Sequence, residues 1–421
     1  MPMEARTCVG EFDGASARYT LHAGSGGVVR QKGEIAGVLG VAHEKVRVVA
    51  HDIGGNFGTK NSIFPEFILA VWASRRIGRP VKWTCERSEA FLSDYQGRDL
   101  VSHCELALDK DGRFLALRGD NLSNLGGYAA STIPLRKGLG IMPGLYRIGA
   151  AHIRGRATLS NTPSTAPYRS AGRPEAIYLI ERLIDDAARE LGVDRVELRR
   201  KNILPESALP YQSPVGPFYD CGKFEENMDM ALKLADVAGY AKRAEESKKR
   251  GKLRGLGIVN AIEQAAGTAQ PEYAEVRFNP SGTAALLMGT KAQGQGHETM
   301  FKQILNERLG IDPNDVQYID GDTDRVAFGM GTNGSRSTVL GGSALHLAAG
   351  KVIEKGRKLA GHLLEAGEQD IEFADGNYRV KGTDRNVSLK QVAMAAFNPT
   401  KWPKGFEGGL YENATYLGQK D

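Results

Sequence analysis

The stretch TAALLMGTKAQGQGHETMFKQILNERLG, residues 283–310, contains a strand, a glycine loop and a helix in that order. The turn Asn279-Pro280-Ser281-Gly282 precedes it, so residues 273–278 and 283–288 are predicted to pair as a hairpin. The apolar spacing that follows predicts a helix over 298–309, with Gly310 as its stop. Glycines at a helix start let backbone N–H groups approach an anionic ligand.

Other segments repeat this mixture of strands and helices in an irregular order. Turns between alternating runs predict two more hairpins, over 101–108 with 113–120 and over 371–373 with 378–380. Residues 174–191 have a helical apolar period and end before Gly192. The sequence also predicts a capped helix after Asp194 (195–202), a helix over 28–39 and a strand over 45–50. This irregular order favours an α+β fold.

Length and composition narrow the possible classes of protein. The 421 residues correspond to two or three domains, and 41% hydrophobic with 25% charged residues is typical of a globular chain. The longest apolar run, 67–73, is too short to cross a membrane. The net charge of +5 does not indicate nucleic-acid binding. Four dispersed cysteines and no signal peptide predict a cytoplasmic protein with reduced thiols.

A charged segment predicts the domain boundary. Residues 241–254 read AKRAEESKKRGKLR, and a β-like run over 255–262 follows. Such a basic run could contact nucleic acid or an anionic membrane, but it is more typical of a solvated helix end and linker. We therefore expect a first domain over 1–240, a linker over 241–254 and a second domain over 255–421.

The 52 glycines gather in short loops, four of which precede predicted helices or follow a strand. These are the first glycine loop (24–27), the second (54–60), the third (293–299) and the fourth (331–338). The standard phosphate-binding loop motif is absent, and the letters GxGxxG at 329–334 lack the strand context of a dinucleotide site. Together the loops suit a large anionic cofactor. Arg336 could bind phosphate or pair with a surface carboxylate.

A further cluster, APYRSAGRPEA at 166–176, places two arginines at a predicted helix start. Arg169 could hold an oxyanion or a carboxylate. Ser170 lacks a visible Ser-His-Asp arrangement, which argues against a nucleophile. No HExxH motif or paired cysteine motif predicts a protein-ligated metal or an iron–sulfur cluster.

Five motifs in this order carry a resemblance to a known family. They are GGNFGTK at 54–60, APYRSAGRPEA at 166–176, ARELGVDRVELRRKNILP at 188–205, AQGQGHET at 292–299 and GTNGSRST at 331–338. Together they resemble the molybdenum-binding large subunit of the xanthine dehydrogenase, aldehyde oxidase and carbon monoxide dehydrogenase family. The resemblance covers essentially the whole chain. It implies two molybdopterin-binding domains, of which the second is incomplete.

The resemblance also implies a cofactor and its binding residues. The cofactor would be molybdopterin, in bacteria often its cytosine dinucleotide form, with molybdenum held by the pterin and not by protein side chains. Arg169 would lie near the oxo group of the metal. The cofactor-binding residues would be Gly54, Gly55, Phe57, Gly58, Arg169, Gly294, Gln295, Gly296, Gly334, Ser335 and Ser337.

Several positions depart from the family pattern. The catalytic base of the family is a Glu in a loop that would follow Asp421, so no residue of this chain is assigned that role. Asn61 replaces an acid of the purine-oxidising members, and Ala171 replaces a bulky aromatic residue of their substrate pocket. Ser170 replaces the cysteine that binds copper in the carbon monoxide enzymes. The matching position for a glutamine near the metal is Gly26.

The expected function is hydroxylation of aldehydes or N-heterocycles with water as the oxygen source. The expected partners are an iron–sulfur subunit and an FAD subunit, because this chain has no cysteine pattern for those clusters, and a chain that supplies the missing C-terminal part. The alternative is a non-catalytic assembly subunit or a truncated fragment that lacks the Glu loop. A nucleotide- or RNA-binding module is disfavoured, because aromatic residues for base stacking are missing near the basic run.

Overall fold

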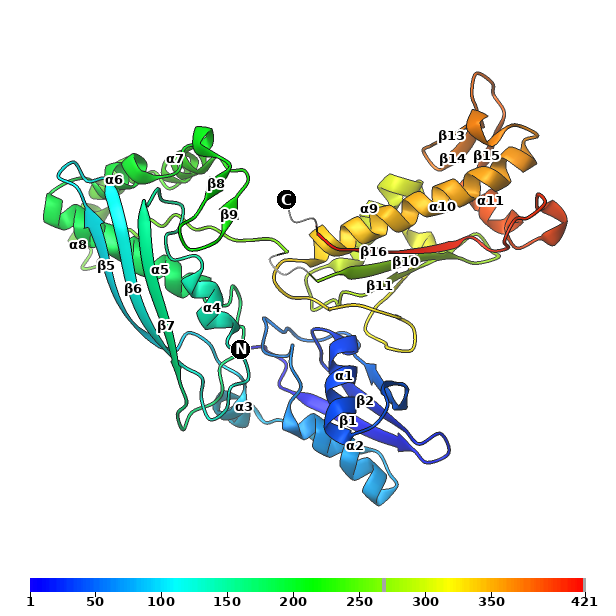
Figure 1. Cartoon of the computed structure of the whole chain (residues 1–421), viewed down its shortest axis with the longest axis horizontal. Coiled ribbons are helices and arrows are strands. Elements are labelled where there is room, and N and C mark those ends of the chain that lie inside the picture. Colours follow the sequence, from blue (N-terminus) through cyan, green and yellow to red (C-terminus); the bar gives the residue numbers. More distant parts are fainter. Residues whose placement is uncertain (267–269, 419–421) are drawn as a thin grey trace. The chain divides into compact units, whose positions relative to one another are not determined.

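The computed structural model describes residues 1–266 and 270–418. The chain forms two compact units: unit 1 comprises Met1–Phe91 and Gln264–Asp421, and unit 2 comprises Leu92–Glu263 (Figure 1). Unit 2 is therefore inserted into unit 1 along the sequence. This division differs from the one expected at 241–254.

The N-terminal part of unit 1 is a four-stranded sheet in the order β3-β2-β1-β4. Strands β1 (Thr7–Asp13) and β2 (Arg18–Ala23) form a hairpin. Helix α1 (Val28–Leu39), which was predicted, leads from β2 to β3 (Val46–Val49), and β2 and β3 are parallel. Helix α2 (Pro65–Ile77) then precedes β4 (Val81–Thr84) and short α3 (Arg87–Ser93). The glycine loops at 24–27 and 54–60 thus follow β2 and β3.

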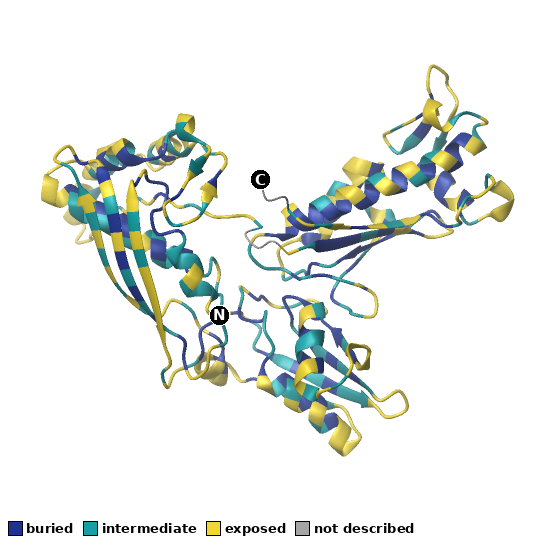
Figure 2. Cartoon of the chain, in the orientation of Figure 1, coloured by how far each residue is buried: buried dark blue, intermediate teal, exposed yellow. Residues whose placement is uncertain are grey.

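The C-terminal part of unit 1 contains a second sheet in the order β12-β11-β10-β16. The predicted hairpin is β10 (Glu272–Phe278) with β11 (Ala284–Met288), and the predicted helix is α9 (His297–Leu309). Helices α9 and α10 (Gly342–Leu363) cover one face of this sheet (Figure 1). Their facing sides are buried together with the strands (Figure 2). Strands β12 (Val316–Ile319) and β16 (Tyr411–Tyr416) complete the sheet.

A small sheet packs near the end of α10. It consists of β13 (Ile371–Ala374), β14 (Asn377–Val380) and β15 (Asn386–Ser388), followed by α11 (Leu389–Ala395). Strands β13 and β14 are the hairpin that the sequence predicted.

Unit 2 is built on the sheet β5 (Leu100–Leu108), β6 (Phe114–Asn124) and β7 (Ala150–Thr158). The predicted hairpin is β5 with β6, and the predicted helix is α5 (Arg173–Leu191). The predicted cap of α6 (Arg195–Asn202) is present, because Asp194 accepts hydrogen bonds from the N–H groups of Val196 and Glu197. The unit is completed by α4 (Ile133–Leu139), β8 (Tyr211–Gln212), β9 (Phe218–Tyr219), α7 (Phe224–Leu234) and α8 (Tyr240–Lys249).

The core of unit 2 combines apolar packing with one buried polar network. Ile180 and Ile184 of α5 pack with Phe114 and Leu117 of β6. Beside them the fully buried Arg199 donates to Glu181 at 2.8 Å, and the Tyr146 hydroxyl donates to the other oxygen of Glu181 at 2.6 Å. Arg199, Glu181 and Tyr146 therefore satisfy one another, as a low-dielectric interior requires.

The charged segment begins with the end of a helix, as expected, and continues as irregular chain. Residues up to 249 belong to α8, where Glu245 pairs with Lys249 one turn apart. The strand expected over 255–262 does not form, and these residues have no regular secondary structure. Glycines at 255 and 257 and the absence of a pairing partner explain this outcome.

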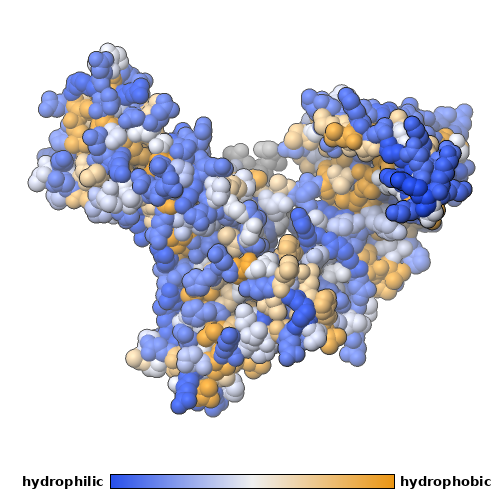
Figure 3. Space-filling model, turned by 180° about the vertical axis from the view of Figure 1, so that it is seen from behind, coloured by the Kyte–Doolittle hydropathy of each residue, from blue (hydrophilic) through white to orange (hydrophobic). Residues whose placement is uncertain are grey.

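The fold is α+β, as predicted, with mixed helices and open sheets. Among the described residues no helix combines the length and the apolar character that a membrane span needs. The face shown in Figure 3 is largely hydrophilic, with apolar residues in scattered groups.

Candidate functional site

The first, second and fourth glycine loops meet in unit 1. The backbone N–H of Gly26 donates to the carbonyl of Lys60 at 3.1 Å, and the N–H of Thr332 donates to the carbonyl of Gly26 at 2.7 Å. A Cβ atom added at Gly331 would lie 2.3 Å from the Gly26 carbonyl oxygen. Only glycine permits this approach, so the three loops are held at backbone contact distance.

The third loop joins them through Thr332. The Thr332 hydroxyl donates to the carbonyl of Lys291 at 2.7 Å and accepts from the N–H of Lys291 at 3.0 Å. It also lies 3.2 Å from the Ser337 hydroxyl. We call the four joined loops the loop cluster. Gly26 and Thr332, which lie 306 positions apart on either side of the inserted unit 2, are thus in direct contact.

The second loop is shaped by Asn56. Its side-chain oxygen accepts from the N–H groups of Gly58 and Lys60, both at 2.9 Å, and its amide nitrogen donates to Asn61 at 2.7 Å. Gly55 and Gly58 have left-handed φ angles of +98° and +106°, and Phe57, at +55°, is 43% exposed. The loop therefore presents its backbone and one aromatic ring outward, while Asn61 is engaged by Asn56.

The third loop leaves the start of α9 open. Gly296 is the N-cap residue of α9 and the helix has no side-chain cap. A Cβ added at Gly294 or Gly296 would meet nothing within 4 Å, so the backbone here is accessible. Gln295 is exposed, and its amide nitrogen lies 3.0 Å from Nε2 of His297. Uncapped N–H groups and the helix dipole favour an anion at this position.

Two buried polar atoms border the third loop. Among the described residues, Nδ1 of His297 and Nε2 of Gln293 have no hydrogen-bond partner. His297 is 3% exposed, and this burial lowers its pKa to about 4. The imidazole is therefore neutral at pH 7. Buried groups without partners are uncommon in folded proteins, and they fit a loop that is completed by a ligand.

The fourth loop divides its polar residues between surface and interior. Ser335 is exposed in a left-handed conformation (φ +57°), whereas Ser337 is buried. Arg336 is 1% exposed, pairs with the fully buried Glu272 and donates to the carbonyls of Gly331, Gln270 and Pro271. Arg336 is therefore neither a phosphate ligand nor a surface ion pair. Arg336 instead stabilises the fourth loop through these interior contacts.

The remaining predicted residues lie in unit 2, in the segment 166–172, which we call the arginine loop. Arg169 is exposed, and Ser170, Ala171 and Gly172 have consecutive positive φ angles of +72°, +41° and +93°. A Cβ added at Gly172 would lie 1.8 Å from the carbonyl oxygen of Pro134, so α5 begins in backbone contact with α4. Such strain in two non-glycine residues is typical of functional sites.

The structure thus groups ten of the predicted cofactor residues and Asn61 in the loop cluster of unit 1. It places Arg169, Ser170 and Ala171 in unit 2. Sequence reasoning missed the connecting residues Asn56, Thr332, Lys291 and Glu272. Asn56 and Thr332 lie inside the quoted motifs, but their role as connectors depends on contacts that only the fold creates. No group of three or more His, Cys, Asp or Glu side chains could hold a metal ion within residues 1–266 and 270–418.

The chemistry of the loop cluster suits a large anionic ligand. It offers an uncapped helix start, buried polar atoms without partners, and open space beside the backbone of Gly294 and Gly296. These are the properties that phosphate-bearing cofactors require. A pterin phosphate therefore fits the residues that are present.

Comparison with known protein families indicates which cofactor domains of this kind bind. Models of a molybdopterin cofactor-binding domain match residues 1–203 and 231–420. Both halves of the chain thus match a molybdopterin cofactor-binding domain.

Similar proteins with known names indicate the class of molybdopterin-binding protein to which this chain is related. The carbon monoxide dehydrogenase large chain of Hydrogenophaga pseudoflava is 34% identical over 97% of this chain and 53% of its own length. The 6-hydroxypseudooxynicotine dehydrogenase complex subunit gamma of Paenarthrobacter nicotinovorans is 34% identical over 99% of this chain and 53% of its own. Quinoline 2-oxidoreductase from Pseudomonas putida 86 has a TM-score of 0.92 and 30% identity, covering 99% of this chain and 55% of that one.

The chain belongs to the molybdenum-binding large subunits of the xanthine dehydrogenase, aldehyde oxidase and carbon monoxide dehydrogenase family, as the sequence motifs predicted. It spans about half the length of the curated relatives that it matches.

Proposed function

We propose that this chain is the cofactor-binding portion of a molybdenum hydroxylase that oxidises N-heterocycles or aldehydes with water as the oxygen source. The observation that carries the proposal is the loop cluster, in which four glycine loops from distant parts of the sequence are joined by backbone hydrogen bonds and by the Thr332 hydroxyl. The family membership supports the identity of the ligand.

The cofactor would rest on backbone groups. Gly54, Gly55, Phe57 and Gly58 would contact it from the second loop, Gly294, Gln295 and Gly296 from the third, and Gly334, Ser335 and Ser337 from the fourth. When bound, the molybdenum cofactor supplies a two-electron redox centre. Donors spread over several loops suit a ligand with a pyrophosphate, so we favour the cytosine dinucleotide form.

The substrate would be recognised from the arginine loop and the second loop. Arg169 would lie near the oxo group of the metal, where its charge could stabilise developing negative charge. The family resemblance assigns substrate recognition to Asn61 of the second loop and to Ser170 and Ala171 of the arginine loop. Ser170 offers no thiolate for copper, which argues against carbon monoxide as the substrate. The relatives that act on nicotine or quinoline by name support an N-heterocycle.

The working enzyme would contain further chains. Relatives are named as a large chain, a large subunit and a complex subunit gamma, which supports an assembly of several subunits. We expect an iron–sulfur subunit and an FAD subunit.

The first test measures molybdenum and released cytidine monophosphate per chain, on protein purified from its native host with its copurifying partners.

The decisive variant is Gly294→Asp. Gly294 has a left-handed φ of +97° with open space around it, and Asp tolerates this conformation better than most residues. The new carboxylate would repel a phosphate at the start of α9, so we expect at least a tenfold loss of cofactor.

The matched control is Gly192→Asp. Gly192 is also left-handed (φ +66°) with open space, but it ends α5 in unit 2. Cofactor content should stay at the wild-type level there. Equal cofactor content in both variants would contradict the assigned site. No molybdenum in the wild-type assembly would instead support the alternative of a non-catalytic assembly subunit.

A further inference from the structure

We propose that Arg98 is a positioning residue that holds the arginine loop in its left-handed conformation and so sets the direction of Arg169. The inference rests on the proposed role of Arg169. Arg98 belongs to unit 2 but lies about seventy positions before the loop, outside every motif that the sequence singled out.

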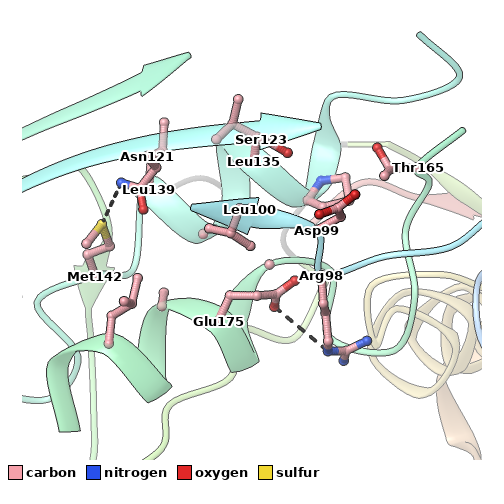
Figure 4. Close-up of a pocket in the computed structure, with 15 residues that line it drawn as sticks. Arg98, Asp99, Leu100, Asn121, Ser123, Leu135, Leu139, Met142, Thr165 and Glu175 are labelled. Carbon is pink, nitrogen blue, oxygen red and sulfur yellow. Dashed lines mark hydrogen bonds and ion pairs between the residues drawn. The ribbon is translucent and has the colours of Figure 1, made fainter. Parts of the chain in front are cut away.

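Arg98 contacts the middle of the arginine loop and the helix that follows it. Its Nη2 donates to the backbone carbonyl of Arg169 at 2.6 Å. Its guanidinium carbon lies 4.9 Å from the centroid of the Tyr168 ring, a cation–π distance. Its Nε is 4.0 Å from Oε2 of Glu175 in the first turn of α5, and Figure 4 shows this pair side by side. One side chain therefore ties the residues before the strained segment to the helix after it.

The loop needs such a restraint. Ser170 and Ala171 both adopt positive φ angles, which cost energy for residues other than glycine. Inside the loop the N–H of Ala171 donates to the carbonyl of Tyr168 at 2.7 Å, which closes a tight turn. The turn alone leaves the Arg169 carbonyl without a partner, and Arg98 supplies it.

The residues around Arg98 are held in place by hydrogen bonds within unit 2. The N–H of Gln96 donates to the carbonyl of Ser164 at 3.2 Å, and the N–H of Ala166 donates to the carbonyl of Gln96 at 2.9 Å. On the other side of Arg98, Asp99 accepts a hydrogen bond from the Asn124 side chain at 2.7 Å. Gln96 before Arg98 and Asp99 after it are thus both tied to unit 2, so the Arg98 side chain transmits a defined position to the loop.

The surroundings strengthen the pair of Arg98 and Glu175. Both line a small cavity of about 30 Å³ with apolar walls from Leu135, Leu139 and Leu179 (Figure 4). The Glu175 side chain is 12% exposed. Apolar, partly closed surroundings screen charges less than water does. The attraction between Arg98 and Glu175 is therefore stronger at 4.0 Å than it would be in water. In the described part of the chain, no hydrogen bond or ion pair engages the guanidinium of Arg169, which leaves it available to a ligand.

The test compares Arg98→Gln and Arg98→Lys with the control Arg118→Gln in the assembled holoenzyme. Arg118 is an exposed arginine of the same unit, paired with Glu105 on the surface of the sheet. Hydrogen–deuterium exchange of the peptide 166–176 is the first readout. We expect exchange in Arg98→Gln to be at least tenfold faster there, with Arg98→Lys intermediate and Arg118→Gln unchanged. Unchanged exchange in Arg98→Gln would overturn the proposal.

Chemical rescue separates positioning from a general loss of structure. In Arg98→Ala, added ethylguanidinium should restore slow exchange of the peptide 166–176, since it can occupy the space of the missing side chain. Ethylammonium, which cannot form the same paired contacts, is the control. Failure of ethylguanidinium to slow the exchange would count against the proposal.

The molybdenum(V) EPR spectrum of the dithionite-reduced holoenzyme is the second readout. We expect Arg98→Gln to change this spectrum in the same direction as Arg169→Gln, at equal molybdenum content. A change in Arg169→Gln alone would show that Arg98 does not direct Arg169 and would overturn the inference. If neither variant changes the spectrum while exchange still rises in Arg98→Gln, the placement of Arg169 beside the metal fails and the restraint on the loop stands.

Discussion

At the scale of single residues, four of the ten non-glycine residues with positive φ angles in the described chain belong to the candidate site. Phe57, Ser170, Ala171 and Ser335 all have positive φ angles although none is glycine. Each such residue costs of the order of 1–3 kcal/mol, and proteins retain the strain mainly where function needs it. All four were predicted as cofactor or pocket residues from motifs alone, and the conformation is independent support for that choice.

His297 gives a prediction about pH. Burial lowers its folded pKa to about 4, while the unfolded chain has the ordinary value near 6.5. The unfolded state therefore binds the proton more readily, so stability is constant above pH 6.5 and falls as the pH decreases toward 4. Between pH 7 and pH 5 the loss should be about 2 kcal/mol from this group.

The measurement is urea unfolding of unit 1 at pH 7 and pH 5, for wild type and His297→Gln. The variant should lose about 2 kcal/mol less between the two pH values, because it has no proton to bind at this position. The control His103→Gln changes an exposed histidine and should keep the wild-type dependence. Identical pH dependence in wild type and His297→Gln would refute the prediction.

Residue patterns revealed the glycine loops but not the role of Arg336. The letters GSRS suggest a charged residue that faces a ligand, and the fold instead turns Arg336 into the interior against Glu272. The direction of a side chain in a loop depends on strands that are distant in sequence, here β10. Single-residue reasoning could therefore locate the loop but could not say which of its polar groups face outward.

At the scale of elements, the buried pair of Arg336 and Glu272 joins the fourth loop to the start of β10. Glu272→Gln would leave the guanidinium charge buried without a counter-charge. Removing one partner of a buried pair commonly costs about 3–5 kcal/mol. We expect a loss of stability of unit 1 in this range by urea unfolding, with a lower content of bound cofactor.

The control for this prediction is Glu354→Gln on α10. Glu354 pairs with Arg357 on the exposed side of the helix, where an ion pair is worth about 0–1 kcal/mol. A loss of less than about 1 kcal/mol in Glu272→Gln would mean that the pair does not brace the loop.

Hairpins and amphipathic helices were the most predictable elements. The Asp-Gly and Asn-Gly type turns and the helical period of 174–191 are local signals, and the observed β5–β6, β10–β11, β13–β14, α5 and α9 follow them closely. The strand expected over 255–262 failed because a β-like composition needs a neighbouring strand to pair with. The parallel pairing of β11 with β12 could not be predicted from local sequence either, because α9 separates the two strands.

At the scale of the whole molecule, unit 2 is a continuous insertion with its own core and its own buried polar network. We therefore predict that residues 92–263 fold when they are expressed alone. A cooperative thermal transition and slow hydrogen exchange at Ile180 and Ile184 would confirm this. An expanded state without a cooperative transition would contradict it.

Residues 1–91 expressed alone are the matched comparison. They contain a complete sheet, but the loop at 24–27 and the segment 46–50, which includes β3, rely on backbone partners at 321–332. We expect faster exchange in these loops than in the full chain. Equal protection would show that the N-terminal part does not depend on the rest of unit 1.

The insertion of unit 2 also sets an order of events during protein synthesis. The N–H of Ala50 and the carbonyls of Gly26 and Val48 find their partners only when residues 321–332 have been made. At typical translation rates of roughly 5–20 residues per second, that interval lasts on the order of ten seconds to a minute. During this time β3 is an unprotected edge strand on the nascent chain. Ribosome-associated chaperones should therefore bind this protein early, near its N-terminal sheet, and release it once the fourth loop has emerged.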